Sequence, residues 1–157
     1  MEGSPPKILP VKPLPKPPPR KFLHPNLPEL PCIMILVAPT KSGKTVLLSN
    51  LLLRDDFYKD IHDNVTIMSN TIDQDETGRF LKQCCDTYVG YDDHILGGII
   101  EQQKQFKKDD MPFIGLLFDD ILGSVKRNSY LNSLVTRSRH YGVGLLAISV
   151  QSFKALG

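Results

Sequence analysis

From Cys32 to Leu53 the sequence reads CIMILV, APTKSGKT and VLLSNLLL in succession. The first six residues are an apolar run of the length of a buried strand, and the last eight are apolar enough for a buried helix. The polar segment between them, Ala38–Thr45, follows the pattern A-x-x-x-x-G-K-T. This order predicts a strand at about 32–37 and a helix at about 44–53, joined by a loop.

The Ala38–Thr45 segment has the residue types of a phosphate-binding loop, with alanine in place of the usual first glycine. Backbone N–H groups of such a loop, together with the N-terminus of the next helix, surround a phosphate. Gly43 permits close backbone approach, Lys44 can reach the β- and γ-phosphates, and Thr45 offers a hydroxyl to Mg²⁺. The residues expected to bind ATP are Ala38, Pro39, Thr40, Lys41, Ser42, Gly43, Lys44 and Thr45.

A second apolar run, FIGLLFDD at Phe113–Asp120, ends in two adjacent carboxylates. In phosphate-loop NTPases the acid that closes this strand holds Mg²⁺, usually through water, opposite the loop threonine. The next acid can polarise the attacking water. We therefore expect Asp119 to be the magnesium ligand and Asp120 the catalytic acid, with strand alternation keeping the two carboxylates apart.

Polar residues flank the last apolar run, Val143–Val150. Gln151 follows it, where an amide can sense the γ-phosphate or orient water, although an ordinary strand-end residue fits the spacing equally well. Arg137 and Arg139 precede it. They are either candidates for a finger that reaches a neighbouring subunit's nucleotide or charges that stabilise a helix end.

Strand and helix signals alternate along the rest of the body. Strands are predicted at 64–69 and 88–91, and helices at 75–83, 94–107 and 127–140. Such alternation with near-continuous apolar strands indicates the α/β class, with a mostly parallel central sheet flanked by helices on both faces.

Ten of the 13 prolines lie in residues 1–30, a density that prevents helices and sheet ladders. We expect a disordered, basic N-terminal arm there, either a docking arm or a simple spacer, and an ATPase core over 31–157. The arm carries a net charge of +3, so the core is close to neutral and is not a basic nucleic-acid clamp by composition. No apolar run is long enough to predict a transmembrane segment.

In their order, Ala38–Thr45, Phe118–Ile121, Ser138–His140 and Ser149–Gln151 resemble the virion DNA-packaging ATPases of poxviruses and other large nucleocytoplasmic DNA viruses. These form part of the FtsK–HerA branch of the RecA-like P-loop ATPases. The resemblance covers about residues 31–154. It implies a RecA-like fold and Mg²⁺-dependent ATP hydrolysis in a homo-oligomeric, usually hexameric, ring.

The resemblance also implies a motor that moves double-stranded DNA into a capsid, located in the virion or the host cytoplasm, with capsid or membrane-associated virion proteins as further partners. It places Lys44 and Thr45 on nucleotide and magnesium, Asp119 on magnesium, Asp120 as the catalytic acid and Gln151 as the sensor. Of the two arginines, Arg139 is the preferred finger.

In the fold of that family another strand usually follows the sensor strand and pairs beside the first one. The chain ends at Gly157, so we expect a C-terminally truncated core with strand 32–37 as an exposed apolar edge. Two other functions remain as alternatives: a nucleoside or nucleotide kinase, and a non-hydrolysing nucleotide-binding interaction fragment.

Overall fold

The computed structural model describes residues 24–74, 76–127 and 129–152, and the strands within them form an all-parallel sheet in the order β1-β5-β4-β2-β3. The strands are β1 Cys32–Val37, β2 Asn64–Ser69, β3 Asp86–Val89, β4 Ile114–Asp119 and β5 Val143–Val150. The helices are α1 Lys44–Leu53, α2 Glu76–Cys84, α3 Asp93–Lys104 and α4 Tyr130–Arg137, with 3-10 helices η1 Leu122–Ser124 and η2 Ser138–Tyr141. The predicted α/β class is therefore confirmed.

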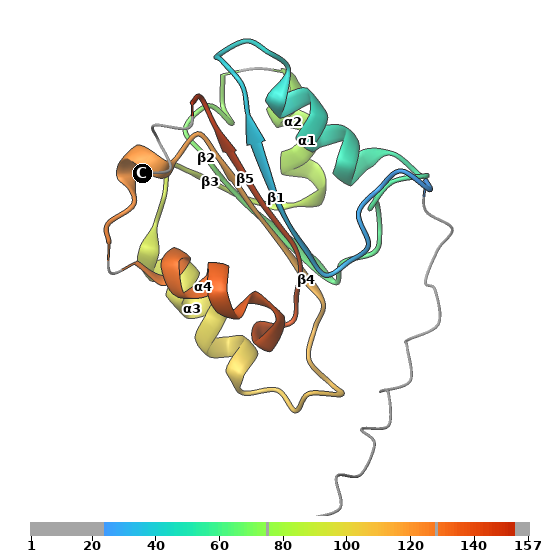
Figure 1. Cartoon of the computed structure of the whole chain (residues 1–157), viewed down its shortest axis with the longest axis vertical. Coiled ribbons are helices and arrows are strands. Elements are labelled where there is room, and N and C mark those ends of the chain that lie inside the picture. The colour runs from blue at the N-terminus through green and yellow to red at the C-terminus, as the bar shows by residue number, and fades with distance from the viewer. Residues whose placement is uncertain (1–23, 75, 128, 153–157) are drawn as a thin grey trace, which may run out of the picture.

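Helices cover both faces of the sheet, with α1 and α2 on one face and α3 and α4 on the other (Figure 1). Strand β5 shows why both faces need to be covered, because its successive apolar residues alternate between the two faces of the sheet. Leu145 and Ala147 belong to the apolar cluster under α1, whereas Leu146 and Ile148 belong to the cluster under α3 and α4. A strand buried on both faces requires apolar residues at nearly every position, which explains its long apolar run.

The predicted element bounds agree best where apolar runs are longest. The segments 32–37, 44–53, 64–69 and 143–150 coincide with β1, α1, β2 and β5. The strand predicted at 88–91 lies two residues earlier, because β3 pairs with Thr66–Ser69 of β2 in that register. The helix predicted at 127–140 is divided into α4 and η2, and Gly142 ends the second with a left-handed φ of 69°. The helices predicted at 75–83 and 94–107 correspond to α2 and α3 with shifted ends.

The last seven residues of the predicted arm pack against the body. The backbone N–H of His24 donates to Asp56 O at 2.8 Å, and Leu27 packs against the cluster that contains α1. The hydroxyl of Tyr58, a side chain only 1% exposed, donates to Pro28 O at 2.7 Å. The folded body therefore begins before residue 31. Residues 1–23, the rest of the predicted arm, lie outside the described residues.

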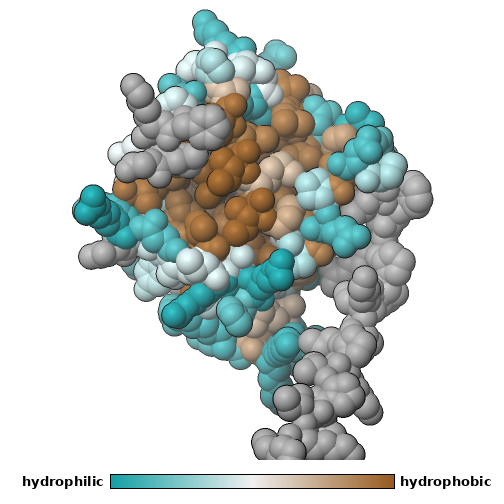
Figure 2. Space-filling model, in the orientation of Figure 1, coloured by the Kyte–Doolittle hydropathy of each residue, from teal (hydrophilic) through white to brown (hydrophobic). Residues whose placement is uncertain are grey.

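Strand β1 forms one edge of the described sheet, as expected. It pairs with β5, and in the part of the chain that the structure describes no strand lies on its other side. Ile33 and Ile35 remain 43% and 51% exposed. Figure 2 shows apolar surface on the side of the molecule where β1 lies. Together with Leu122, Val125 and Val135, these isoleucines line a hollow of about 460 Å³.

Gly78 allows α2 to approach the loop that precedes it. A Cβ built on Gly78 would lie 1.8 Å from the carbonyl oxygen of Ile72. We expect Gly78→Ala to lower the free energy of unfolding by about 1–3 kcal/mol, because backbone must shift to make room. Urea unfolding measures this. Gly98→Ala is the matched control in α3, where a Cβ would meet nothing within 4 Å, and it should raise stability by roughly 0.5–1 kcal/mol. Equal stabilities for the two variants would contradict the packing seen at α2.

Candidate functional site

The carboxyl ends of three neighbouring strands place polar side chains in one row. Strand pairing sets Ser149 of β5 beside Asp119 of β4, and Asp119 beside Ser69 of β2. Paired residues of adjacent strands point to the same face of the sheet. The chain leaves β2 through α2 on one face and leaves β4 toward α4 on the other, so a crevice opens at their carboxyl ends.

Asp119 is held by three hydroxyl groups. Thr45 Oγ1 and Ser69 Oγ each donate to Asp119 Oδ2 at 3.2 Å, and Ser149 Oγ donates to Oδ1. The residue is only 4% exposed, and these bonds offset the cost of removing a carboxylate from water. The fold thereby brings together Thr45 and Asp119, two predicted site residues that are 74 positions apart in the sequence.

The Ala38–Thr45 loop begins directly after β1 and ends in the first turn of α1. Gly43 has a φ of 89°, and Lys41 also adopts a left-handed φ of 62°. Glycine at 43 is therefore required by the backbone conformation, and a Cβ there would meet nothing within 4 Å. Ala38 does not have a positive φ, so this position does not need the usual glycine. Lys44 Nζ donates to Ala38 O at 2.5 Å and to Pro39 O at 2.9 Å, which places the ammonium within the loop.

Asp120 is not the last residue of the strand, which ends at Asp119. It has a left-handed φ of 54°, and its N–H donates to Ser149 O at 3.1 Å. The expectation that strand alternation separates the two carboxylates was therefore wrong, because the left-handed turn at Asp120 separates them. Gln151 Nε2 donates to Asp120 Oδ2 at 2.7 Å. The structure thus places the predicted sensor amide on the predicted catalytic carboxylate.

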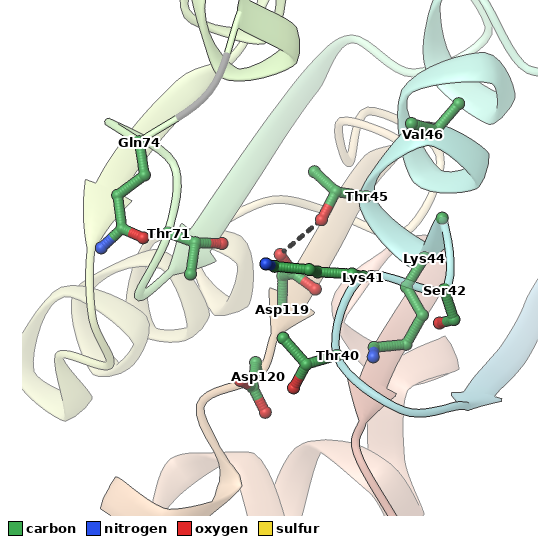
Figure 3. A pocket seen from close by; sticks show the side chains of 11 residues that line it. Thr40, Lys41, Ser42, Lys44, Thr45, Val46, Thr71, Gln74, Asp119 and Asp120 are labelled. Carbon is green, nitrogen blue, oxygen red and sulfur yellow. Dashed lines mark hydrogen bonds between the residues drawn. The ribbon is translucent and has the colours of Figure 1, made fainter.

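A cavity of about 460 Å³ lies between this loop and the ends of β2 and β4 (Figure 3). In that view Thr45 and Asp119 point toward each other and the side chain of Lys41 extends into the space between them and Thr71. The lining residues are Thr40, Lys41, Ser42, Gly43, Lys44, Thr45, Val46, Thr71, Gln74, Asp119 and Asp120. Eight of these eleven were predicted from the sequence, namely residues 40–45, Asp119 and Asp120, whereas Val46, Thr71 and Gln74 were not.

Sequence reasoning missed the polar residues that follow or close the neighbouring strands. Ser69, Asn70 and Thr71 stand at the end of β2, and Ser149 lies near the end of β5. The available signal was the polar run Ser69–Thr71 directly after an apolar strand. What the sequence does not contain is the strand order, which alone places β2 and β5 on either side of β4.

The donor set fits a magnesium ion. Thr45 and Asp119 supply a hydroxyl and a carboxylate oxygen within 3.2 Å of each other, and Mg²⁺ prefers oxygen ligands while retaining several waters. No group of three or more His, Cys, Asp or Glu side chains suited to a metal occurs within 24–74, 76–127 and 129–152. Thr45 and Asp119 would leave most coordination positions of such an ion to other oxygen ligands.

Arg139 lies far from this cavity within its own chain. It belongs to η2, which precedes β5, whereas Gln151 follows β5. A strand of eight residues spans roughly 25 Å at its usual rise per residue. Arg139 instead lines a hollow near the amino ends of the strands, together with Phe106 and His140. Arg137 ends α4 and, like Arg139, is exposed.

Comparisons with protein-family models, with curated proteins and with solved structures gave no match. Within the described residues, none of the helices combines the length and apolar character needed to cross a membrane. The geometry at the carboxyl edge of the sheet is therefore the basis for a functional proposal.

Proposed function

We propose that this chain binds and hydrolyses ATP with Mg²⁺ at the cavity between the Ala38–Thr45 loop and the ends of β2 and β4. The observation that carries the proposal is the hydrogen bond between Thr45 Oγ1 and Asp119 Oδ2. It joins a G-K-T loop, at the start of a helix, to the acid that closes β4, a central strand that β5 separates from β1. This combination supports a RecA-like P-loop NTPase.

Each side chain has a role that follows from its place. The N–H groups of the loop and the N-terminus of α1 attract the phosphates, and Lys44 can leave the loop carbonyls to reach them. Thr45 and Asp119 would hold Mg²⁺, which would supply positive charge beside the nucleotide phosphates. Ser69 and Ser149 keep the Asp119 carboxylate in position.

In this proposal Asp120 orients and deprotonates the attacking water. The water oxygen bonds to the γ-phosphorus, the bond from that phosphorus to the bridging oxygen breaks, and ADP and phosphate leave. The Asp120 carboxylate accepts the proton of the water. Gln151 holds this carboxylate through its amide and is the proposed sensor of the γ-phosphate.

We further propose that hydrolysis drives movement of double-stranded DNA into a capsid by a homo-oligomeric ring, a function that rests on the family resemblance. The position of Arg139 supports a ring, because this side chain can reach a nucleotide only on another subunit. A kinase is less well supported. Kinases of this type close arginines over the phosphates, whereas the cations that line the described cavity are Lys41 and Lys44.

ATP turnover with and without double-stranded DNA tests the proposal. DNA-stimulated release of phosphate is the expected result. Phosphoryl transfer to a nucleoside would identify a kinase instead, and nucleotide binding without turnover would identify a non-hydrolysing binding fragment.

Lys44→Ala should weaken ATP binding and leave the fold intact. The Lys44 ammonium donates to the carbonyls of Ala38 and Pro39 in the loop, so its loss removes phosphate-directed charge without opening the core. Calorimetric titration with ATP measures the affinity, and thermal unfolding checks the fold. Lys59→Ala is the control, since this lysine pairs with Asp55 on the surface. An unchanged ATP affinity in Lys44→Ala would rule out this loop as the phosphate site.

A further inference from the structure

Asn70 lies directly after β2 and reaches across to the chain that leaves β4. Its Nδ2 donates to the carbonyl oxygen of Asp120 at 2.7 Å. The two residues meet because β2 and β4 are neighbours, with Ser69 paired to Asp119 one position earlier. Ser69 Oγ in turn accepts from Thr71 N at 3.1 Å and so shapes the turn on which Asn70 sits.

Asp120 needs such a contact because of its backbone. A left-handed φ of 54° is uncommon for a residue with a side chain, and it persists where the surroundings hold it. Two bonds hold the backbone, from Asp120 N to Ser149 O and from Asn70 to Asp120 O. A third, from Gln151, holds the carboxylate. Hydrogen bonds from segments at the ends of both neighbouring strands, β2 and β5, therefore hold Asp120 in place.

We propose that Asn70 is a positioning residue that keeps Asp120 in its left-handed conformation and thereby sets the place of its carboxylate for hydrolysis. This inference rests on the proposed ATPase function. Asn70 acts on the backbone carbonyl, so its effect on the water passes through the geometry of Asp120. Displacement of a catalytic group by about 1 Å can lower a rate on the order of 10²-fold.

Steady-state ATP hydrolysis tests the role with Asn70→Ala, and with Asn50→Ala as the matched control. Asn50 is half-buried, and its Nδ2 likewise donates to a backbone carbonyl oxygen, that of Val46, at 2.8 Å on α1. We expect Asn70→Ala to lower kcat on the order of 10²-fold with KM unchanged, and Asn50→Ala to behave as the wild type. A raised KM with kcat unchanged would overturn the proposal, because Asn70 would then contact the nucleotide.

A double variant checks that the effect passes through Asp120. In an Asp120→Asn background, Asn70→Ala should cause no further loss, because the group that it positions is already disabled. Full additivity of the two losses would overturn the proposal.

Hydrogen exchange in the nucleotide-free protein separates this inference from the proposed function. Without Asn70 the Asp120 amide should exchange faster, since its bond to Ser149 O opens more often. Asn50→Ala should leave that amide unchanged. Absence of ATP turnover in the wild type would refute the ATPase function. The exchange rate of the Asp120 amide would still show whether Asn70 holds Asp120 in its conformation. Unchanged exchange of Asp120 in Asn70→Ala would overturn the positioning role.

Discussion

Asp120→Asn should abolish ATP hydrolysis while Mg-ATP still binds. Asparagine keeps the size of the side chain but cannot accept the proton of the attacking water, and such proton transfer contributes on the order of 10² to 10⁴-fold. The amide oxygen can still accept from Gln151, so the local geometry is preserved. Phosphate release measures the loss, and calorimetry with Mg-ATP measures binding.

Asp119→Asn is the control for this prediction. In the wild type the Asp119 carboxylate accepts hydrogen bonds from three hydroxyl groups, one of them that of Thr45. Its replacement should therefore weaken the magnesium dependence of nucleotide binding. Normal magnesium dependence in Asp119→Asn, combined with its loss in Asp120→Asn, would exchange the roles of the two acids.

Arg139→Ala should bind ATP normally and hydrolyse it on the order of 10³-fold more slowly, as expected for loss of an arginine finger. Arg139 lies near the amino ends of the strands, whereas the candidate ATP cavity of the same chain lies at their carboxyl ends. A contribution of Arg139 to hydrolysis therefore requires a second subunit. Specific activity of the wild type should accordingly rise with protein concentration.

Mixing experiments give this prediction a direct test. Arg139→Ala and Lys44→Ala subunits, each impaired alone, should recover some activity together, because one interface then combines an intact loop with an intact arginine. Arg137→Ala is the matched control, an exposed arginine at the end of α4 whose loss should have the smaller effect. Activity that is independent of concentration, with no recovery in the mixture, would argue against a trans-acting finger and weaken the ring proposal.

Local sequence patterns were sufficient for several elements and for part of the site. The apolar runs at 32–37, 64–69 and 143–150 marked β1, β2 and β5, because parallel strands covered on both faces are apolar along their length. The pattern of Ala38–Thr45 also predicted the loop and the start of α1. The loop conformation itself requires a glycine at position 43, so this signal is local in the sequence. Asp119 was recognisable as the acid that closes an apolar strand.

The remaining features depended on tertiary structure. The serines that hold Asp119, the contact of Asn70 with Asp120 and the distance of Arg139 from the cavity all follow from the strand order. That order is set by which apolar faces pack together over long stretches of sequence, and no local pattern records it. The left-handed turn at Asp120 is also a tertiary feature, because bonds from two other segments hold a conformation that its own residue type does not favour.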